Sequence, residues 1–291
     1  DGEHQARQLW ESEGIKNSDG AKMTGYYLHN ESKLHGYYYS VNAQLSKNFS
    51  NGLGMMAAYT HSNAKSLSDG SGDQISEFVN TYNVNGNNAP ELGYSNYVAP
   101  NRVIANVNYT FSHDKLGTNV GLFYEGFNIG FFSGYSYSRV SYVMNNVSGT
   151  SAYQLLYIPT NEDLNNMNFV SEENKEAFKS FIENDAYMST HRGQYEQRNA
   201  IVAPWLNRIN FKISQEIYFN VNGQRHTLDV GVDFNNIANM FCSKWSVYKS
   251  LDSDVILNYN NGTYTFTAPT WSTYNNLSST WQVRVHLKYA F

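Results

Sequence analysis

Residues 281–291, WQVRVHLKYAF, alternate between apolar and polar side chains. Successive side chains of a β-strand point to opposite faces, so this pattern predicts a strand with one apolar and one polar face. The apolar side chains are all odd-numbered: Trp281, Val283, Val285, Leu287, Tyr289 and Phe291. The polar ones are even-numbered, and only the small Ala290 departs from the pattern: Gln282, Arg284, His286 and Lys288.

The same alternation recurs along the chain and predicts seven strands in all. The other six lie at residues 37–49, 53–59, 103–111, 120–124, 209–219 and 228–234. The composition agrees, because 24 Tyr suit a pleated surface and 21 Gly, with abundant Asn, supply turn conformations. A helical bundle is not expected.

The connections between these strands alternate between short and long. The short ones, rich in Asn, Asp and Gly as tight hairpins require, lie around residues 50–52, 114–117 and 222–223. The long ones span roughly residues 63–100, 136–206 and 238–279. Each exceeds the roughly 12–15 residues usual inside a compact domain. Short turns at one end and long loops at the other are typical of outer-membrane β-barrels.

Aromatic residues bound the apolar faces, as expected for a wall that crosses a bilayer. Strands that run toward the short turns or the C-terminus finish on Phe49, Phe111, Phe219 and Phe291. The ten steps from Trp281 to Phe291 span roughly 23 Å at ~3.3 Å per residue and ~45° tilt, close to the ~25 Å apolar band of such barrels. The polar faces predict a hydrated lumen. Exceptions are Gln215 on the apolar side, and Ile104 and Phe123 on the polar side.

These observations predict an all-β fold: a portion of an antiparallel, up-and-down transmembrane β-barrel with long extracellular loops, in the bacterial outer membrane. Bacterial single-chain barrels have an even number of strands, whereas seven is odd. Residues 1–291 are therefore expected to be the C-terminal part of a larger barrel, either as a fragment or as one of two assembling pieces. Outer-membrane lipid and the remaining strands are then its partners.

Charge and composition exclude several other classes. The net charge is −5 and Lys and Arg are scattered singly, so no basic surface for nucleic acid is expected. No run of 18 apolar residues predicts a transmembrane helix, and Asp1 begins the chain without a signal peptide. The single Cys242 cannot form an internal disulfide and has no adjacent base, so an inert thiol is expected.

No catalytic or cofactor-binding motif is present, and the sequence predicts no enzyme, no cofactor and no metal centre. The eight histidines include no pair at helical metal-ligand spacing. Residues 69–73, DGSGD, resemble the start of a calcium loop, but Asn80 stands where Glu would complete it, so a solvated turn is the favoured interpretation. Residues 172–185 predict a short helix after Ser171, with Phe178, Phe181 and Ile182 on one face. That helix is expected to pack within an outer loop, with a lid as the alternative.

Several segments resemble a known family, the TonB-dependent outer-membrane receptors of Bacteroidetes, notably the Oar-like group. The C-terminal segments LDVGVDFNNIANMFCSKW (228–245) and WQVRVHLKYAF (281–291) are similar to its closing strands. HRGQYEQRNAIVAPWLNRINFKISQEIYF (191–219) resembles the run entering the third-last strand, and residues 37–74 an earlier hairpin and loop. The resemblance covers most of the chain.

The resemblance implies a barrel of about 22 strands closed around an N-terminal plug, which imports scarce nutrients with energy from TonB. The chain carries neither plug nor TonB-contacting segment, so the TonB partner would act through the missing N-terminal part, and a surface lipoprotein lid is a possible further partner. Leu287, Tyr289 and Phe291 resemble the signal by which the barrel-assembly machinery selects its clients.

Ligand contacts are expected from aromatic and amide side chains of the outer loops. The candidates are Tyr94, Asn96, Tyr97, Tyr153, Trp205, Trp245 and Trp271. For each, loop packing or anchoring at the membrane interface is the alternative. Two other functions stay open: a porin- or adhesin-type barrel completed by another chain, and a secreted β-sandwich binding protein.

Overall fold

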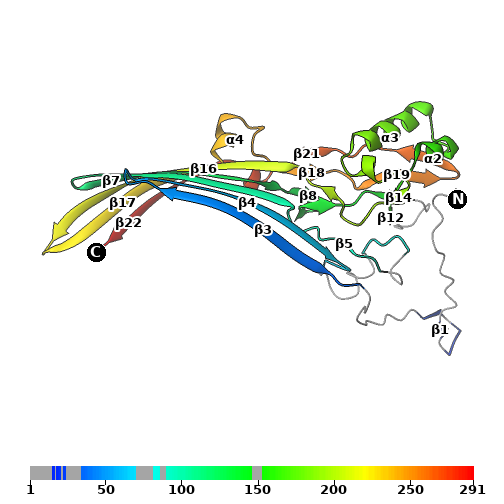
Figure 1. Cartoon of the computed structure of the whole chain (residues 1–291), viewed down its shortest axis with the longest axis horizontal. Helices are drawn as coiled ribbons and strands as arrows, with labels where there is room; N and C mark the ends of the chain where they lie inside the picture. The colour runs from blue at the N-terminus through cyan, green and yellow to red at the C-terminus, as the bar shows by residue number, and fades with distance from the viewer. Residues whose placement is uncertain are drawn as a thin grey trace.

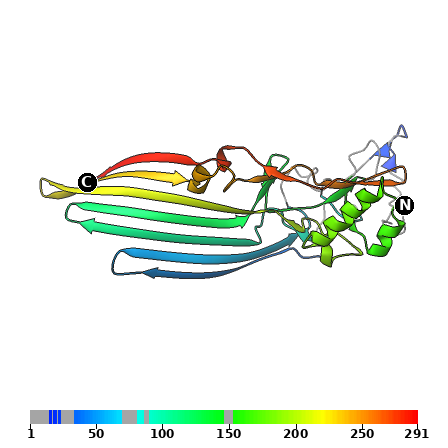
Figure 2. The same ribbon diagram turned by 90° about the horizontal axis from the view of Figure 1, so that it is seen from above.

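A computed structural model describes residues 15–16, 18–20, 22–23, 34–69, 81–85, 90–145 and 153–291. The described residues are organised around one large antiparallel sheet with the strand order β22-β17-β16-β7-β6-β4-β3, in which the short β5 (Gly93–Tyr94) also pairs with β4. The seven strands are β3 (Tyr37–Asn48), β4 (Leu53–Ser66), β6 (Asn101–His113), β7 (Leu116–Asn128), β16 (Trp205–Val221), β17 (Gln224–Asn235) and β22 (Gln282–Ala290). They lie side by side in a single curved layer (Figures 1 and 2). The all-β prediction and its seven strands are confirmed.

The strand register brings every predicted apolar set to the same face of the sheet. In the middle of the sheet Val107 of β6 lies opposite Met55 of β4 and Leu122 of β7. At the C-terminal edge Val232 of β17 lies between Ile213 of β16 and Val285 of β22. The sheet therefore has one continuous apolar face and one polar face. A strand shifted in register by a single residue would instead place its apolar side chains on the opposite face.

The apolar face is exposed. Leu45 is 82% and Val285 70% solvent-accessible, and the described residues place no second sheet over them. The exception Gln215 satisfies its polar atoms within this face: it accepts a hydrogen bond from Thr118 Oγ1 (2.7 Å) and donates to the Gly117 carbonyl (3.1 Å). A soluble sandwich would bury this face.

The sheet is open among the described residues. Its edge strands are β3 and β22, and no described strand pairs with the outer side of either. A sheet edge presents unpaired backbone N–H and C=O groups that readily accept another strand. The structure thus provides two positions at which the sheet can be extended.

The three short turns lie together at one end of the sheet, where the C-terminus also lies (Figure 2). The turn between β16 and β17 has Asn222 and Gly223 at its centre, with φ angles of 53° and 84°. Two successive positive φ angles match the right-handed twist of the flanking strands, and Asn-Gly adopts them at little cost. The predicted sorting of short and long connections is confirmed.

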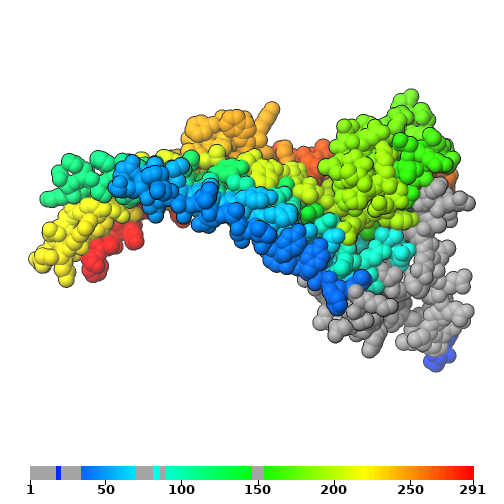
Figure 3. Space-filling view, viewed as in Figure 1, coloured from blue at the N-terminus to red at the C-terminus, as the bar shows by residue number. Residues whose placement is uncertain are grey.

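The long connections form a compact cap with a hydrophobic core of its own, where only loops were expected. The cap lies at the end of the sheet opposite the short turns (Figures 1 and 3). Its main sheet has the order β12-β11-β19-β20: β12 (Tyr153–Leu155), β11 (Val143–Asn145), β19 (Val255–Asn260) and β20 (Thr263–Phe266). Leu156, Ile158, Phe178, Ile256 and Leu257 are completely buried in the core.

Smaller elements complete the cap and its surroundings. A second four-stranded sheet has the order β21-β18-β8-β9: β21 (Trp271–Thr273), β18 (Lys249–Leu251), β8 (Gly130–Phe132) and β9 (Tyr135–Tyr137). The strand pairs are β10 (Arg139–Val140) with β15 (Ile201–Val202), β13 (Tyr157–Ile158) with β14 (Gln194–Tyr195), and β1 (Ile15–Lys16) with β2 (Lys22–Met23). The helical segments are α2 (Asn161–Asn166), α3 (Glu172–Asn184), α4 (Ile237–Phe241) and the 3-10 turns Met188–Thr190 and Leu277–Ser279.

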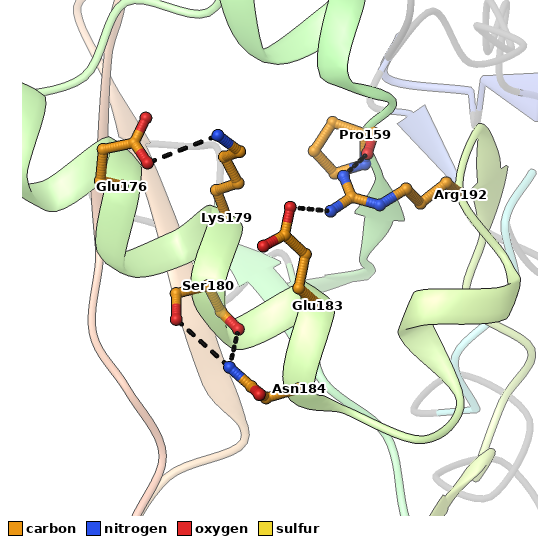
Figure 4. Close-up of polar contacts among 7 residues, drawn as sticks. All are labelled: Pro159, Glu176, Lys179, Ser180, Glu183, Asn184 and Arg192. Carbon is orange, nitrogen blue, oxygen red and sulfur yellow. Dashed lines mark hydrogen bonds and ion pairs between the residues drawn. The ribbon is translucent and has the colours of Figure 1, made fainter.

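The predicted helix is α3, and it packs inside the cap. Ser171 caps it by accepting a hydrogen bond from the Asn174 N–H at 3.2 Å. Phe178 and Ile182 are fully buried, and the Phe178 ring lies 5.1 Å from that of Phe266. On the other side of the helix Arg192 pairs with Glu183 at 3.4 Å and donates to the Pro159 carbonyl at 3.0 Å (Figure 4). These contacts anchor α3 at both its apolar and its polar side.

No helix among the described residues has the length and apolar composition needed to cross a membrane.

Candidate functional site

The three long connections meet around one cavity of about 220 Å³. The first connection contributes Asp69, Tyr82 and Asn96, the second contributes Tyr137, Arg139 and Asn199, and the third contributes Asp254. Sequence positions almost 190 residues apart are therefore brought to one place. Concave sites with a few convergent polar groups are the usual location of ligand binding, which makes this cavity the candidate functional site.

Backbone hydrogen bonds hold the first two connections together at the cavity. The Asn96 carbonyl accepts from the N–H groups of Ser138 (2.7 Å) and Arg139 (3.3 Å). The rings of Tyr97 and Tyr137 lie 5.6 Å apart, and Tyr137 lines the cavity. The aromatic rings of Tyr97 and Tyr137 thus lie beside the backbone hydrogen bonds that join the two connections.

Tyr94 interacts with two cations. It stands opposite Lys65 in the β4–β5 pair, and the Lys65 ammonium lies 4.3 Å from the centre of the Tyr94 ring. The Arg139 guanidinium also lies 4.3 Å from that centre. Each such contact contributes about 0.5–2 kcal/mol, depending on desolvation. Tyr94 therefore positions Arg139, whereas Arg139 itself lines the cavity.

Arg198 and Asn199 form the floor and are held by many polar contacts. Arg198 donates to the carbonyls of Ser66 (2.6 Å) and Tyr82 (3.3 Å). Asn199, at a positive φ of 57°, donates from its side-chain amide to Asp69 Oδ2 (3.1 Å) and to the Tyr94 carbonyl (2.8 Å). The side chains of Arg198 and Asn199 therefore join the second connection to the first.

Asn96 and Asp254 are two cavity residues with buried polar side chains. Among the described residues, none donates a hydrogen bond to the buried Asn96 Oδ1. A buried acceptor left unsatisfied costs stability, and such atoms are rare in folded proteins. Burial also raises the pKa of Asp254, whose carboxylate accepts a hydrogen bond from the Tyr82 hydroxyl at 3.3 Å. Both side chains therefore place buried oxygen atoms in the wall of the cavity.

The structure groups three of the sequence-derived ligand candidates near this cavity. Asn96 lines it, Tyr97 contacts its Tyr137 wall, and Tyr94 holds Arg139. The other four lie elsewhere: Tyr153 is in β12, Trp205 begins β16, Trp245 follows α4 and Trp271 is in β21. The Trp205 indole N–H donates a hydrogen bond to Asn207 Oδ1 at 3.0 Å.

Sequence inspection missed Tyr137, Arg139, Asn199 and Asp254. The alternating YSYSRV run at residues 135–140 is the one sequence signal that could have drawn attention to Tyr137 and Arg139. Asp254 and Asn199 lie in segments without periodicity. Their relevance depends on contacts between connections, which no local pattern reveals.

Leu287, Tyr289 and Phe291 line the free edge strand β22 and its end. The Tyr289 and Phe291 rings are 5.7 Å apart, and the His226 ring stacks 5.6 Å from Tyr289. Phe219 joins this cluster at 6.3 Å from Tyr289. An aromatic cluster on the apolar face at the short-turn end matches the girdle expected there.

Metal ligation finds no support in the described part of the chain, which contains no group of three His, Cys, Asp or Glu side chains able to hold an ion. Of the DGSGD segment only Asp69 is described, and residues 70–73 lie outside the described residues. On the polar face His286 lies between Asp229 (3.4 Å) and Asp233 (3.6 Å), and Asp233 also pairs with Arg284 at 2.8 Å. On this part of the polar face, Asp233 is thus paired with the Arg284 guanidinium.

Glu196 is the most deeply buried ionisable group of the cap and is expected to make its stability depend on pH. Its side chain is fully buried and accepts from the Tyr142 N–H at 3.0 and 3.1 Å, and burial raises its pKa well above the ordinary value. The folded state therefore keeps a proton that the unfolded state loses above about pH 4.3. We predict that cap stability falls by about 1.4 kcal/mol per pH unit from there up to the folded-state pKa.

Glu196→Gln removes this dependence, because the amide oxygen can still accept from Tyr142 without carrying charge. Thermal unfolding of the cap between pH 4 and pH 8 measures the effect in both proteins. The same downward slope in the variant as in the wild type would contradict the assignment to Glu196.

Comparison with known proteins gives no match: no family model, curated protein or solved structure is similar to this chain at a significant level.

Proposed function

We propose that this chain forms part of the wall and the outer surface of an outer-membrane β-barrel that imports a scarce nutrient, as a TonB-dependent receptor does. The observation that carries the proposal is the single-layer sheet whose seven strands direct their apolar side chains to one exposed face. Water is a poor solvent for so large an apolar surface, which monomeric soluble proteins rarely expose. The acyl chains of lipids, which are themselves apolar, would cover this face without a free-energy cost.

The two free edges support the placement of this sheet in a larger barrel. A membrane wall cannot leave backbone N–H and C=O groups unpaired in hydrocarbon, since each would cost several kcal/mol. β3 and β22 must therefore pair with further strands in the bilayer. Those strands, together with a plug and a TonB-contacting segment, belong to the remainder of the receptor that the sequence resemblance implies.

The cap supports a role in selective uptake. It lies at the end with the long connections, which is the outer end in barrels of this kind, and its cavity contains residues from all three connections. A rigid cap with a defined cavity suits the capture of a particular ligand better than free diffusion.

Labelling of adjacent residues in β3 tests the membrane placement. In the complete protein carrying Cys242→Ser, a bimane fluorophore is attached through Leu45→Cys or, as the matched control, through Gln44→Cys. We expect lipids brominated in their acyl chains to quench the label strongly at position 45 and weakly at position 44, because the two side chains point to opposite faces. Equal quenching at both positions would refute lipid contact at this face.

The porin alternative predicts a different electrical behaviour. The complete receptor in a planar lipid bilayer is expected to hold its lumen closed and pass no steady current, because a plug fills it. A stable open-channel current would favour the porin-type barrel. Migration as a monomer in detergent-free buffer, with no heat-modifiable band in outer-membrane fractions, would favour the secreted sandwich.

A further inference from the structure

We propose that the apolar face binds an anionic phospholipid at its short-turn end, with Lys47 of β3 as the residue that holds the phosphate. The inference rests on the proposed function for the presence of a bilayer, and it adds a lipid partner of defined charge. In barrels of this kind the short turns face the periplasm, so the lipid belongs to the leaflet on that side.

The charged side chains of the large sheet are sorted between its two faces. All four carboxylates of its seven strands have the parity of the polar face: Glu125, Glu216, Asp229 and Asp233. Lys47 and Lys65, by contrast, have the parity of the apolar face. Lys65 donates a hydrogen bond to Gln197 Oε1 at 2.8 Å, whereas no carboxylate of the seven strands shares a face with Lys47. The described sheet therefore supplies no anion to Lys47.

Lys47 lies near the end of the apolar band rather than at its centre. It precedes the girdle residue Phe49 by two positions, which places it about 5 Å inside the girdle at ~3.3 Å per residue and ~45° tilt. Its ammonium lies 5.7 Å from the centre of the Phe49 ring, so the side chain turns toward the short-turn end. Long cationic side chains that reach the interface in this way keep their charge among the lipid headgroups. A lysine binds a phosphate there as a compact point charge.

Tyr109 supplies a second polar group at the same end of the face. Lys47 is paired with Met55 of β4, and Met55 is paired with Val107 of β6, two residues before Tyr109. Tyr109 is thus two strands from Lys47, a lateral distance of about 10 Å. Its side chain is 39% exposed on the apolar face, and its hydroxyl can donate a hydrogen bond to a headgroup oxygen. Met55 is exposed between the two and would contact the acyl chains of the same lipid.

The test measures the local lipid preference beside Lys47 in the complete protein. The protein carries Cys242→Ser and Met55→Cys, with a bimane fluorophore attached at position 55, in vesicles of equal parts phosphatidylglycerol and phosphatidylcholine. The acyl chains of either one lipid or the other are brominated. We expect phosphatidylglycerol to quench as a lipid with an about fivefold higher local binding constant, which is the contribution of one lysine near anionic lipid.

Substitutions of Lys47 and Tyr109 assign this preference to its residues. Lys47→Met should abolish the preference and leave insertion intact, because it removes a charge from the lipid-facing side. Lys47→Glu should reverse the preference in favour of phosphatidylcholine, which a loss of packing alone does not produce. Tyr109→Phe should reduce the preference by less than Lys47→Met does. A label attached through Val230→Cys, on the apolar face of β17 at the other side of the sheet, is the matched control and should show no preference.

Three outcomes would overturn the lipid assignment: equal quenching by the two lipids at position 55, a preference that survives Lys47→Met, or the same preference at position 230. In each of these cases both brominated lipids still quench the label. If the membrane placement itself is wrong, neither lipid quenches at position 55 or at position 45, so the two failures are distinguishable.

Discussion

Val107→Lys is expected to prevent stable insertion of the protein into outer membranes or lipid vesicles, whereas Asn108→Lys inserts normally. Val107 is the central residue of β6 and lies among Met55 and Leu122 on the apolar face. A lysine at the bilayer midplane costs about 2–4 kcal/mol. Asn108 is the next residue and points to the polar face, where a lysine meets water.

The two substitutions lie in the same strand at nearly the same depth and introduce the same charge. They therefore differ in the face of the sheet to which the new lysine points. Folding yield in lipid vesicles, followed by heat-modifiable migration, measures both variants. If the apolar face were solvated by water, Val107→Lys would fold as well as Asn108→Lys and would be more soluble. That result would end the membrane interpretation.

Phe178→Ala is expected to destabilise the cap strongly and leave the sheet inserted. Phe178 is fully buried and its ring packs against Phe169 (5.8 Å) and Phe266 (5.1 Å). Truncation of such a phenylalanine costs about 3–5 kcal/mol, which lowers the melting temperature of a domain this size by roughly 10–20 °C. Near-ultraviolet circular dichroism during heating follows the cap transition.

Lys179→Ala on the same helix is the control, because Lys179 makes only an exposed pair with Glu176 at 3.5 Å (Figure 4). Its cap transition should move by no more than a degree or two. A Phe178→Ala protein that loses heat-modifiable migration as well would show that cap and sheet fold as one unit, contrary to the separate cores described above.

Separate cores have a functional consequence. The sheet is held together by backbone pairing between its strands, whereas the cap has an apolar cluster of its own. Asn96 and Tyr137 line the cavity and lie outside the strands of the large sheet, so substitutions at these two positions are expected to leave the pairing of those strands intact.

The strands of the wall were predictable because each carries its own signal. Alternating apolar residues predicted the strands β16 and β22 and the face to which each side chain points. The Asn222-Gly223 pair predicted the hairpin turn, and neither prediction needed any knowledge of distant contacts. Helix α3 was predictable for the same reason, since Ser171 caps it and Phe178, Phe181 and Ile182 share a face.

The cap and its cavity were not predictable. Most cap strands have two to four residues, too few for a period to be visible, and β11 pairs with β19 in parallel across more than 100 residues. Of the cavity residues, Asn96 was named beforehand as a ligand candidate, and Asp69 only as part of the calcium-like DGSGD segment. The burial of Glu196 could not be foreseen, because its neighbour Tyr142 lies 54 positions away.

The amino-acid sequence by itself determined the seven strands, their two faces and the order of short and long connections, because alternation and turn chemistry act between residues that are near neighbours in the chain. Only the tertiary structure decided that the long connections fold into a cap and that Asn96, Tyr137 and Asp254 meet at one cavity. The physical reason is that packing joins residues by distance in space, and a one-dimensional pattern carries no record of which distant segments will meet.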